Sequence, residues 1–183
     1  MVFQLFRRNE RAGTIRALYG VIVAQARLPA FYRAYGVPDT VEGRFDMIVL
    51  HVALFFRRVR AEEEVRALGQ GVFDAFCLDM DHNLREMGVS DVRLPKRMGE
   101  FGAAFYGRAA SYDRALADDD DSLAAALAKN VLAAEGVSDG AKRLAAYVRA
   151  AVRALERQSS AGIAAAVLDF PDPDTILVAG NGT

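Results

Sequence analysis

Apolar residues recur along most of this chain with the spacing of an α-helix, and no segment alternates convincingly as a β-strand. The segment from about 40 to 59 shows this pattern most clearly. It carries one wide apolar stripe and a second stripe on roughly the opposite side: Phe45, Ile48, Val49, Val52, Phe55, Phe56 and Val59, and then Met47, Leu50 and Leu54. A helix that is apolar on two sides is typical of the centre of a bundle. The alternative is that one of its sides receives a partner helix.

The remaining apolar stripes predict further helices before and after this central one. We expect them at about 11–25, 29–35, 62–88, 90–116, 122–134 and 139–158. The fold class is therefore all-α, a single-domain bundle of about seven or eight helices over residues 1–170. The central helix lies near 40–59, and residues 171–183 are predicted to form a loose C-terminal tail.

Individual residues indicate where helices end and cross. Asp39 is predicted to cap the free amides at the start of the central helix, with Glu42 reaching back as in a capping box. Gly36 suits the end of the preceding short helix. Gly69 and Gly71 interrupt a helical pattern, which indicates either a kink or a close crossing of two helices.

Charge is balanced over the whole chain but not along it. The 183 residues hold 23 basic and 24 acidic side chains, which excludes a globally basic nucleic-acid binder. Residues 1–60, however, hold ten arginines and four acids, a net charge of +6. Such a segment can meet acidic lipid headgroups, nucleic acid or an acidic partner. The alternative is that the two halves of the chain neutralise each other in the fold.

The apolar runs are too short to predict a membrane span. The longest, from Met47 to Phe56, has about half of the roughly 20 residues that a bilayer requires. The start of the chain also lacks the pattern of a secretory signal. We therefore expect a cytoplasmic protein.

Motifs for catalysis and cofactor binding are missing from the sequence. It contains no phosphate-cradling glycine loop, no GxSxG elbow, no HExxH and no paired CxxC. His51, at the edge of the apolar stripe, is interpreted as a packing residue with one hydrogen bond, and a base or a haem ligand is the alternative. Cys77 is interpreted as a small core residue. We therefore predict no catalytic, metal-binding or cofactor-binding residues and a protein that is not an enzyme.

Four blocks of polar and aromatic residues are denser than helix formation requires, at 27–32, 36–51, 84–91 and 105–112. In this order and spacing they resemble the ubiquinol–cytochrome c chaperone family, whose mitochondrial members assist assembly of cytochrome b into respiratory complex III. The resemblance covers about Tyr19 to Leu116. It is most specific from Val37-Pro38-Asp39-Thr40 through Gly43-Arg44-Phe45-Asp46 to His51.

The resemblance implies a non-enzymatic assembly chaperone without a cofactor. Its partners would be cytochrome b or another membrane-protein client, a small partner protein, and the ribosome or a membrane surface, but no DNA. Because the sequence shows no mitochondrial targeting extension, it resembles a bacterial member of the family. The implied location is the cytoplasm, with a peripheral position at the inner face of the bacterial plasma membrane.

The same blocks and their surroundings provide the candidate partner-binding residues. They are Arg27, Tyr32, Asp39, Thr40, Arg44, Phe45, Asp46, His51, Arg85, Glu86, Lys96, Tyr106, Arg108 and Tyr112. Arginines suit carboxylates and phosphates, and aromatic rings suit amphipathic surfaces. The alternative is that these arginines pair with nearby acids and fix the packing of the helices.

Two other functions stay open at this point. One is a nucleic-acid-binding or ribosome-binding helical module that uses the basic N-terminal segment. The other is an enzyme or haem-handling protein that uses His51.

Overall fold

The structure, a computed structural model, describes residues 2–86 and 88–176, with side chains from residue 10 onward. In these ranges the chain forms eight α-helices and one short 3₁₀ helix. They are α1 (Val2–Ala26), α2 (Pro29–Ala34), α3 (Val41–Arg60), α4 (Glu63–Glu86), α5 (Leu94–Ala117), α6 (Asp120–Asn130), α7 (Asp139–Glu156), α8 (Ser160–Ala164) and η1 (Pro173–Thr175). The predicted all-α fold class is confirmed.

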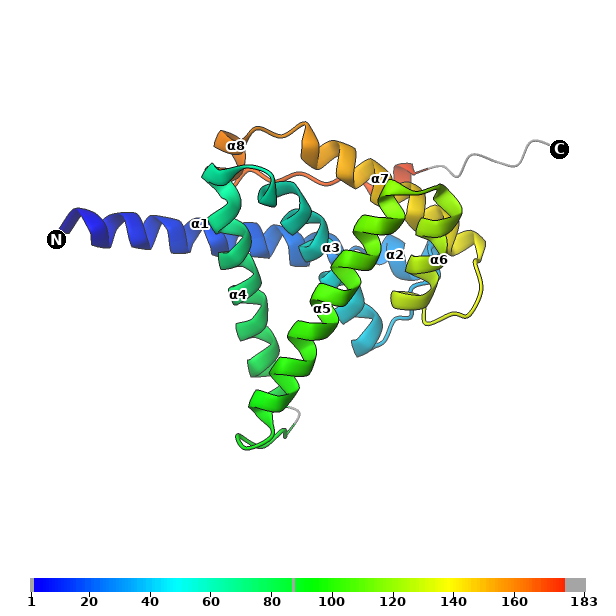
Figure 1. Ribbon diagram of the computed structural model, residues 1–183, viewed down its shortest axis with the longest axis horizontal. Coiled ribbons are helices and arrows are strands. Elements are labelled where there is room, and N and C mark those ends of the chain that lie inside the picture. Colours follow the sequence, from blue (N-terminus) through cyan, green and yellow to red (C-terminus); the bar gives the residue numbers. More distant parts are fainter. Residues whose placement is uncertain (1, 87, 177–183) are drawn as a thin grey trace.

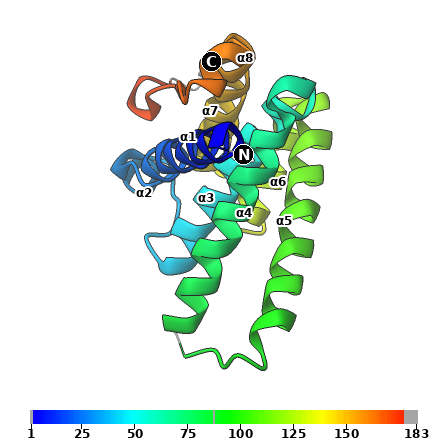
Figure 2. The same cartoon turned by 90° about the vertical axis from the view of Figure 1, so that its left-hand side faces the viewer.

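The helices form a body with two projecting parts (Figure 1). The amino-terminal part of α1 extends beyond the body on one side. The antiparallel helices α4 and α5 form a hairpin whose connecting segment lies at its far end, away from the body (Figure 2). Helices α7 and α8 lie on the side opposite to that end, so the hairpin end is remote from the C-terminal part of the fold.

Helix α3 is the centre of the bundle, as its two apolar stripes predict. It packs against α1, α4, α5 and α7, and the nine consecutive residues 47–55 are all buried. A helix can bury a full run of this kind only when neighbours cover every side of it.

Helix α4 runs unbroken past Gly69 and Gly71, and both glycines lie at close crossings with other helices. A Cβ atom at Gly69 would lie 2.6 Å from Cγ2 of Val59 on α3. A Cβ atom at Gly71 would collide with the side chain of Ile15 on α1. The two glycines therefore let α4 approach both of its neighbours.

Thr40, and not Asp39, caps α3. The backbone amide of Gly43 donates a hydrogen bond to Oγ1 of Thr40 at 3.1 Å, whereas the Asp39 carboxylate pairs with Arg44. Among the described residues Glu42 makes no hydrogen bond back to the cap, so the predicted capping box is wrong. Gly43 lies against the carbonyl oxygen of Pro38, where any Cβ atom would clash.

The predicted start of the loose tail, residue 171, lies too early in the chain, because residues 171–176 contact the body of the fold. The hydroxyl of Tyr35 donates to the carbonyl oxygen of Pro173 at 2.6 Å, and Nε2 of Gln25 donates to that of Pro171 at 2.9 Å. Pro173 is buried within η1. Residues 171–176 are thus held against the body, because polar groups of α1 and α2 bind their carbonyls. The remainder of the predicted tail, 177–183, lies outside the described residues.

We expect Thr40→Ala to lower the free energy of unfolding by about 1 kcal/mol, because it leaves the first amides of α3 without a cap. Asp39→Ala should cost clearly less, since its ion pair with Arg44 is exposed to solvent. Urea unfolding of the two variants beside the parent protein measures this difference. A larger loss for Asp39→Ala would contradict the assignment of the cap.

Candidate functional site

The structure distributes the fourteen candidate residues over three surface regions and the core. Five lie where α2 meets the start of α3, a region called here the α2–α3 corner: Arg27, Tyr32, Asp39, Thr40 and Arg44. Others lie where α3 packs on α5: Phe45, Asp46, Arg108 and Tyr112, with Tyr106 beside them. Arg85, Glu86 and Lys96 belong to the hairpin tip, which comprises residues 85, 86 and 88–99 at the far end of α4 and α5. His51 lies in the core.

The α2–α3 corner is built by local sequence signals. Pro29 lies in the first turn of α2, and Gly36 follows the helix with a φ of 74°, a left-handed conformation that favours glycine. Val37 is then buried, and its amide donates to the carbonyl of Phe31 at 3.3 Å. The loop before α3 is therefore fixed, and so is the cap at Thr40.

Arg44 is the centre of this corner. Its Nε donates to Asp39 at 2.7 Å, and its guanidinium carbon lies 5.7 Å from the centre of the Tyr32 ring. The Tyr32 hydroxyl donates to the carbonyl of Ala26 at 2.8 Å. The Arg44 side chain is still 56% exposed. The corner therefore presents an oriented guanidinium with donors left for a carboxylate or phosphate of a partner.

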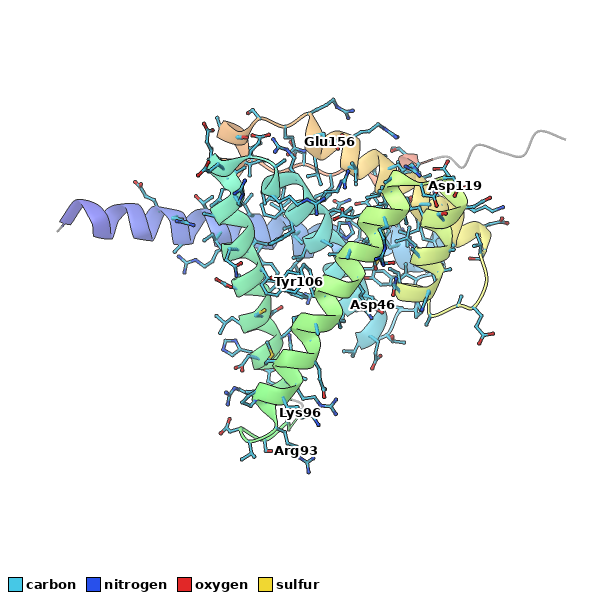
Figure 3. The ribbon with its side chains drawn as sticks, in the orientation of Figure 1. Asp46, Arg93, Lys96, Tyr106, Asp119 and Glu156 are labelled. Carbon is cyan, nitrogen blue, oxygen red and sulfur yellow. The ribbon has the colours of Figure 1, made fainter. Side chains whose placement is uncertain are left out.

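The contact between α3 and α5 is mainly structural. Arg108 donates to Asp46 at 2.5 Å, and only 27% and 17% of the two side chains are exposed. Burial raises the pKa of the Asp46 carboxyl, and the neighbouring Arg108 offsets part of that rise. The neighbouring Phe45 ring packs against both Phe76 and Phe101, with ring centres 6.0 and 5.4 Å away. Figure 3 places Asp46 beside α5.

Tyr112 is not accessible to a partner, so its prediction as a contact residue is wrong. Its side chain points into the core, where it is 2% exposed. Its hydroxyl has no hydrogen-bond partner among the described residues. Tyr106, six residues earlier on α5, is 49% exposed and covers Phe73 at 5.4 Å between ring centres. It lies between α4 and α5 in Figure 3 and stays a candidate.

His51 is also inaccessible, and its prediction as a contact residue is wrong. Its ring is fully buried, with Nδ1 at 2.7 Å from the Met47 carbonyl and Nε2 at 2.8 Å from the Tyr147 hydroxyl. Because a carbonyl only accepts, Nδ1 carries the proton and Nε2 accepts from Tyr147. Burial lowers the pKa of His51 to about 4, so the ring is neutral at physiological pH. It makes two hydrogen bonds where the sequence predicted one.

The hairpin tip is exposed and rich in cations. Arg85 pairs with both Asp81 and Asp91, while Glu86 is exposed. Lys96 is 84% exposed and lies 4.0 Å from Glu100. Arg93 and Lys96 lie at the end of the hairpin in Figure 3.

Sequence reasoning missed a cluster of arginines at the end of α3. Arg57, Arg58 and Arg60 line a pocket of about 240 Å³ together with residues of α7. Arg58 pairs with Glu62 at 2.8 Å, and both other arginines pair with Asp113. The sequence feature that could have indicated this cluster is the dense run of arginines at 57–60. Since acids from beyond residue 60 neutralise it, part of the +6 charge of the N-terminal segment is structural.

None of the described helices has the length and apolar character needed to cross a bilayer. In the same part of the chain, no three His, Cys, Asp or Glu side chains are grouped so that they could hold a metal ion.

Comparison with known proteins adds to this geometry. Residues 33–170, well over half of the chain, match the sequence model of the family described as ubiquinol-cytochrome C chaperone. The ubiquinol-cytochrome-c reductase complex assembly factor 1 of Xenopus laevis is 29% identical over 118 residues, which are 63% of this chain and 58% of the frog protein. The corresponding factor of Mus musculus is 28% identical over 111 residues, 60% of this chain and 38% of the mouse protein.

A solved structure is similar over a greater length. The crystal structure of the Cbp3 homolog from Brucella abortus is 40% identical in sequence and superposes with a TM-score of 0.86. The similarity covers 96% of this chain and 99% of that chain. The chain thus shares the whole fold of this homolog but spans only part of the length of the frog and mouse proteins.

Acidification should destabilise the protein through His51. The pKa of this ring is about 4 in the folded state against 6.5 for an unperturbed histidine. The unfolded chain therefore takes up the proton first, and stability falls as the pH drops from 6.5 toward 4. Linkage gives a loss of about 2 kcal/mol by a pH of about 5. Urea unfolding at a series of pH values measures it.

The His51→Asn variant provides the comparison. His82→Gln is made in both proteins, so that His51 is the only histidine of the reference protein and its variant has none. Asp46 contributes in the opposite direction, because its raised pKa favours the folded state on acidification. The informative quantity is therefore the difference in pH dependence between the two proteins. Equal pH dependence with and without His51 would contradict the neutral buried ring.

Proposed function

This chain belongs to the ubiquinol–cytochrome c chaperone family, and we propose that it is a non-enzymatic assembly chaperone that binds newly made cytochrome b. In this role it aids biogenesis of the ubiquinol–cytochrome c reductase complex. The observation that carries the proposal is the family match over residues 33–170. That range holds all candidate residues except Arg27 and Tyr32. The frog and mouse relatives, both named as assembly factors of this complex, support the same function.

The α2–α3 corner supplies a way to hold such a client reversibly. An exposed guanidinium beside an aromatic ring binds a carboxylate without a covalent step, and solvent competes with it when the client leaves. Tyr106 offers an amphipathic ring on another side of the fold. The body behind both surfaces is fixed by buried contacts, so binding requires little ordering of the chaperone.

The same proposal includes a location and further partners. The chain would act in the cytoplasm, peripherally at the inner face of the bacterial plasma membrane, where a membrane-protein client is made. A small partner protein and the ribosome are the other partners that the family resemblance suggests.

The alternative of a nucleic-acid or ribosome-binding module has less support from the charges. Of the eight arginines in residues 10–60, where side chains are described, four are ion-paired: Arg44, Arg57, Arg58 and Arg60. Paired arginines contribute less to a field that attracts phosphates.

Deleting the gene should selectively reduce the b-type haem signal of the membranes and their ubiquinol–cytochrome c reductase activity. A client without its chaperone fails to assemble and is degraded. Reduced-minus-oxidised spectra and activity assays of the deletion strain, its parent and the complemented strain measure both effects. Unchanged spectra and activity would contradict the proposed function.

Arg44→Glu should reduce the cytochrome b that co-purifies with the tagged chain by on the order of tenfold, the value of one charge-assisted hydrogen bond. Arg153→Glu, an exposed arginine on α7, is the matched control and should bind as the parent does. The double variant Asp39→Arg, Arg44→Asp keeps an ion pair at the corner with its charges exchanged. If this exchange restores client binding, the corner is structural and not a contact surface.

A further inference from the structure

We propose that the hairpin tip is a membrane-contacting surface that binds anionic lipid headgroups and inserts the side chain of Val92 among them. The proposal rests on the proposed function for its location at a membrane. It assigns that contact to one surface of the fold.

Val92 is the first observation. Its side chain is 91% exposed, more than any other large apolar side chain in the described part of the chain. The neighbouring Leu94 is buried, and the amides of Arg93 and Leu94 both donate to the Ser90 carbonyl, at 2.9 and 3.1 Å. The turn therefore holds Leu94 inward and leaves Val92 in solvent. The fold itself gains nothing from an apolar side chain in that position.

The charge around Val92 is the second observation. Residues 85–99 hold four cations and two acids, Glu86 and Asp91, and the Asp91 carboxylate is held by Arg85. Directly after Val92 come Arg93, Lys96 and Arg97 with no acid before Glu100. Lys96 and Arg97 share that single carboxylate, at 4.0 and 3.3 Å, and remain 84% and 64% exposed. In the described part of the chain Arg93 has no ion pair.

The shape of the tip is the third observation. It is the end of the α4–α5 hairpin and lies away from the body in both views (Figures 1 and 2). A flat surface can therefore touch it without meeting α7 or α8. An exposed apolar side chain followed in the sequence by Arg93, Lys96 and Arg97 matches a bilayer interface, where apolar groups lie below the phosphates and cations lie among them.

RNA is another polyanion that the hairpin tip could bind, but the exposed Val92 favours a membrane over RNA. Cations alone suffice to bind phosphates of RNA, so an exposed valine would add nothing. A membrane uses both features, because its headgroups attract the cations and its acyl chains accept the apolar side chain.

The test is flotation of the purified full-length chain with vesicles made of equal parts phosphatidylglycerol and phosphatidylcholine, or of phosphatidylcholine alone. We expect binding to the anionic vesicles only, weakened by salt. Val92→Asp and the double variant Arg93→Glu, Lys96→Glu should each lower the bound fraction by on the order of tenfold. Val92→Trp should raise it. Inorganic phosphate at the concentration of the lipid should not displace the chain, which separates a headgroup in a bilayer from free phosphate.

Matched controls lie elsewhere on the fold. Val167→Asp changes an apolar side chain that is 54% exposed, and Lys142→Glu reverses an exposed cation on α7. Both should bind vesicles as the parent does. Thermal unfolding checks that all variants fold.

Three outcomes would overturn the proposal. The first is no binding to anionic vesicles, and the second is equal binding by the parent and Val92→Asp. The third is binding to single-stranded RNA, with loss in the charge variant only and no vesicle binding, which would assign the tip to nucleic acid. Flotation uses no client, so the two proposals can fail separately. Loss of vesicle binding with cytochrome b still co-purifying would contradict the membrane contact alone. Vesicle binding without co-purification of cytochrome b would contradict the proposed function alone.

Discussion

A buried chain of hydrogen bonds constrains how the helices of the body can pack. Nε2 of Gln25 on α1 donates to the Tyr147 hydroxyl at 3.1 Å, which donates to His51, whose Nδ1 donates to the Met47 carbonyl. The same Gln25 amide binds the Pro171 carbonyl. Each group needs its partner, because an unsatisfied buried polar atom costs about 1–3 kcal/mol. These hydrogen bonds therefore fix α1, α3, α7 and the segment that begins at residue 171 relative to one another.

With its middle held in this way, α3 positions different features at its two ends. Its first turn, capped by Thr40, places Arg44 at the α2–α3 corner. Its last turn places Arg57, Arg58 and Arg60 among acids and carbonyls of α5, α7 and the start of α4. At the first end Arg44 is 56% exposed, whereas at the second end Arg58 is buried and Arg57 and Arg60 share the carboxylate of Asp113. The contact surface and the structural cluster are thus separated by the length of one helix.

The sequence predicts the features of the fold that depend on the periodicity of apolar residues. It does not predict contacts between residues that are far apart in the sequence. The central position of α3 follows from its two apolar stripes. At Gly69 and Gly71 the sequence indicates either a kink or a close crossing, and the positions of Val59 and Ile15 show the crossings. The location of His51 did not follow, because its partner Tyr147 is 96 residues away. Asp39 and Thr40 are both good capping residues, so backbone geometry decides between them. At the hairpin tip, no sequence pattern distinguishes the exposed Val92 from the buried Leu94.

Ion pairs within the fold determine how much of the positive charge of residues 1–60 is available to a partner. Acids from beyond residue 60 pair with three arginines of the basic N-terminal segment: Asp113 binds Arg57 and Arg60, and Glu62 binds Arg58. The remaining exposed cations are spread over the surface, and different surfaces present different groups: Arg44 at the α2–α3 corner, and Arg93, Lys96 and Arg97 at the hairpin tip. Exposed charges interact over about one Debye length, close to 8 Å at physiological salt. Recognition by this protein therefore depends on which small surface reaches a partner, and the net charge of the chain does not decide it.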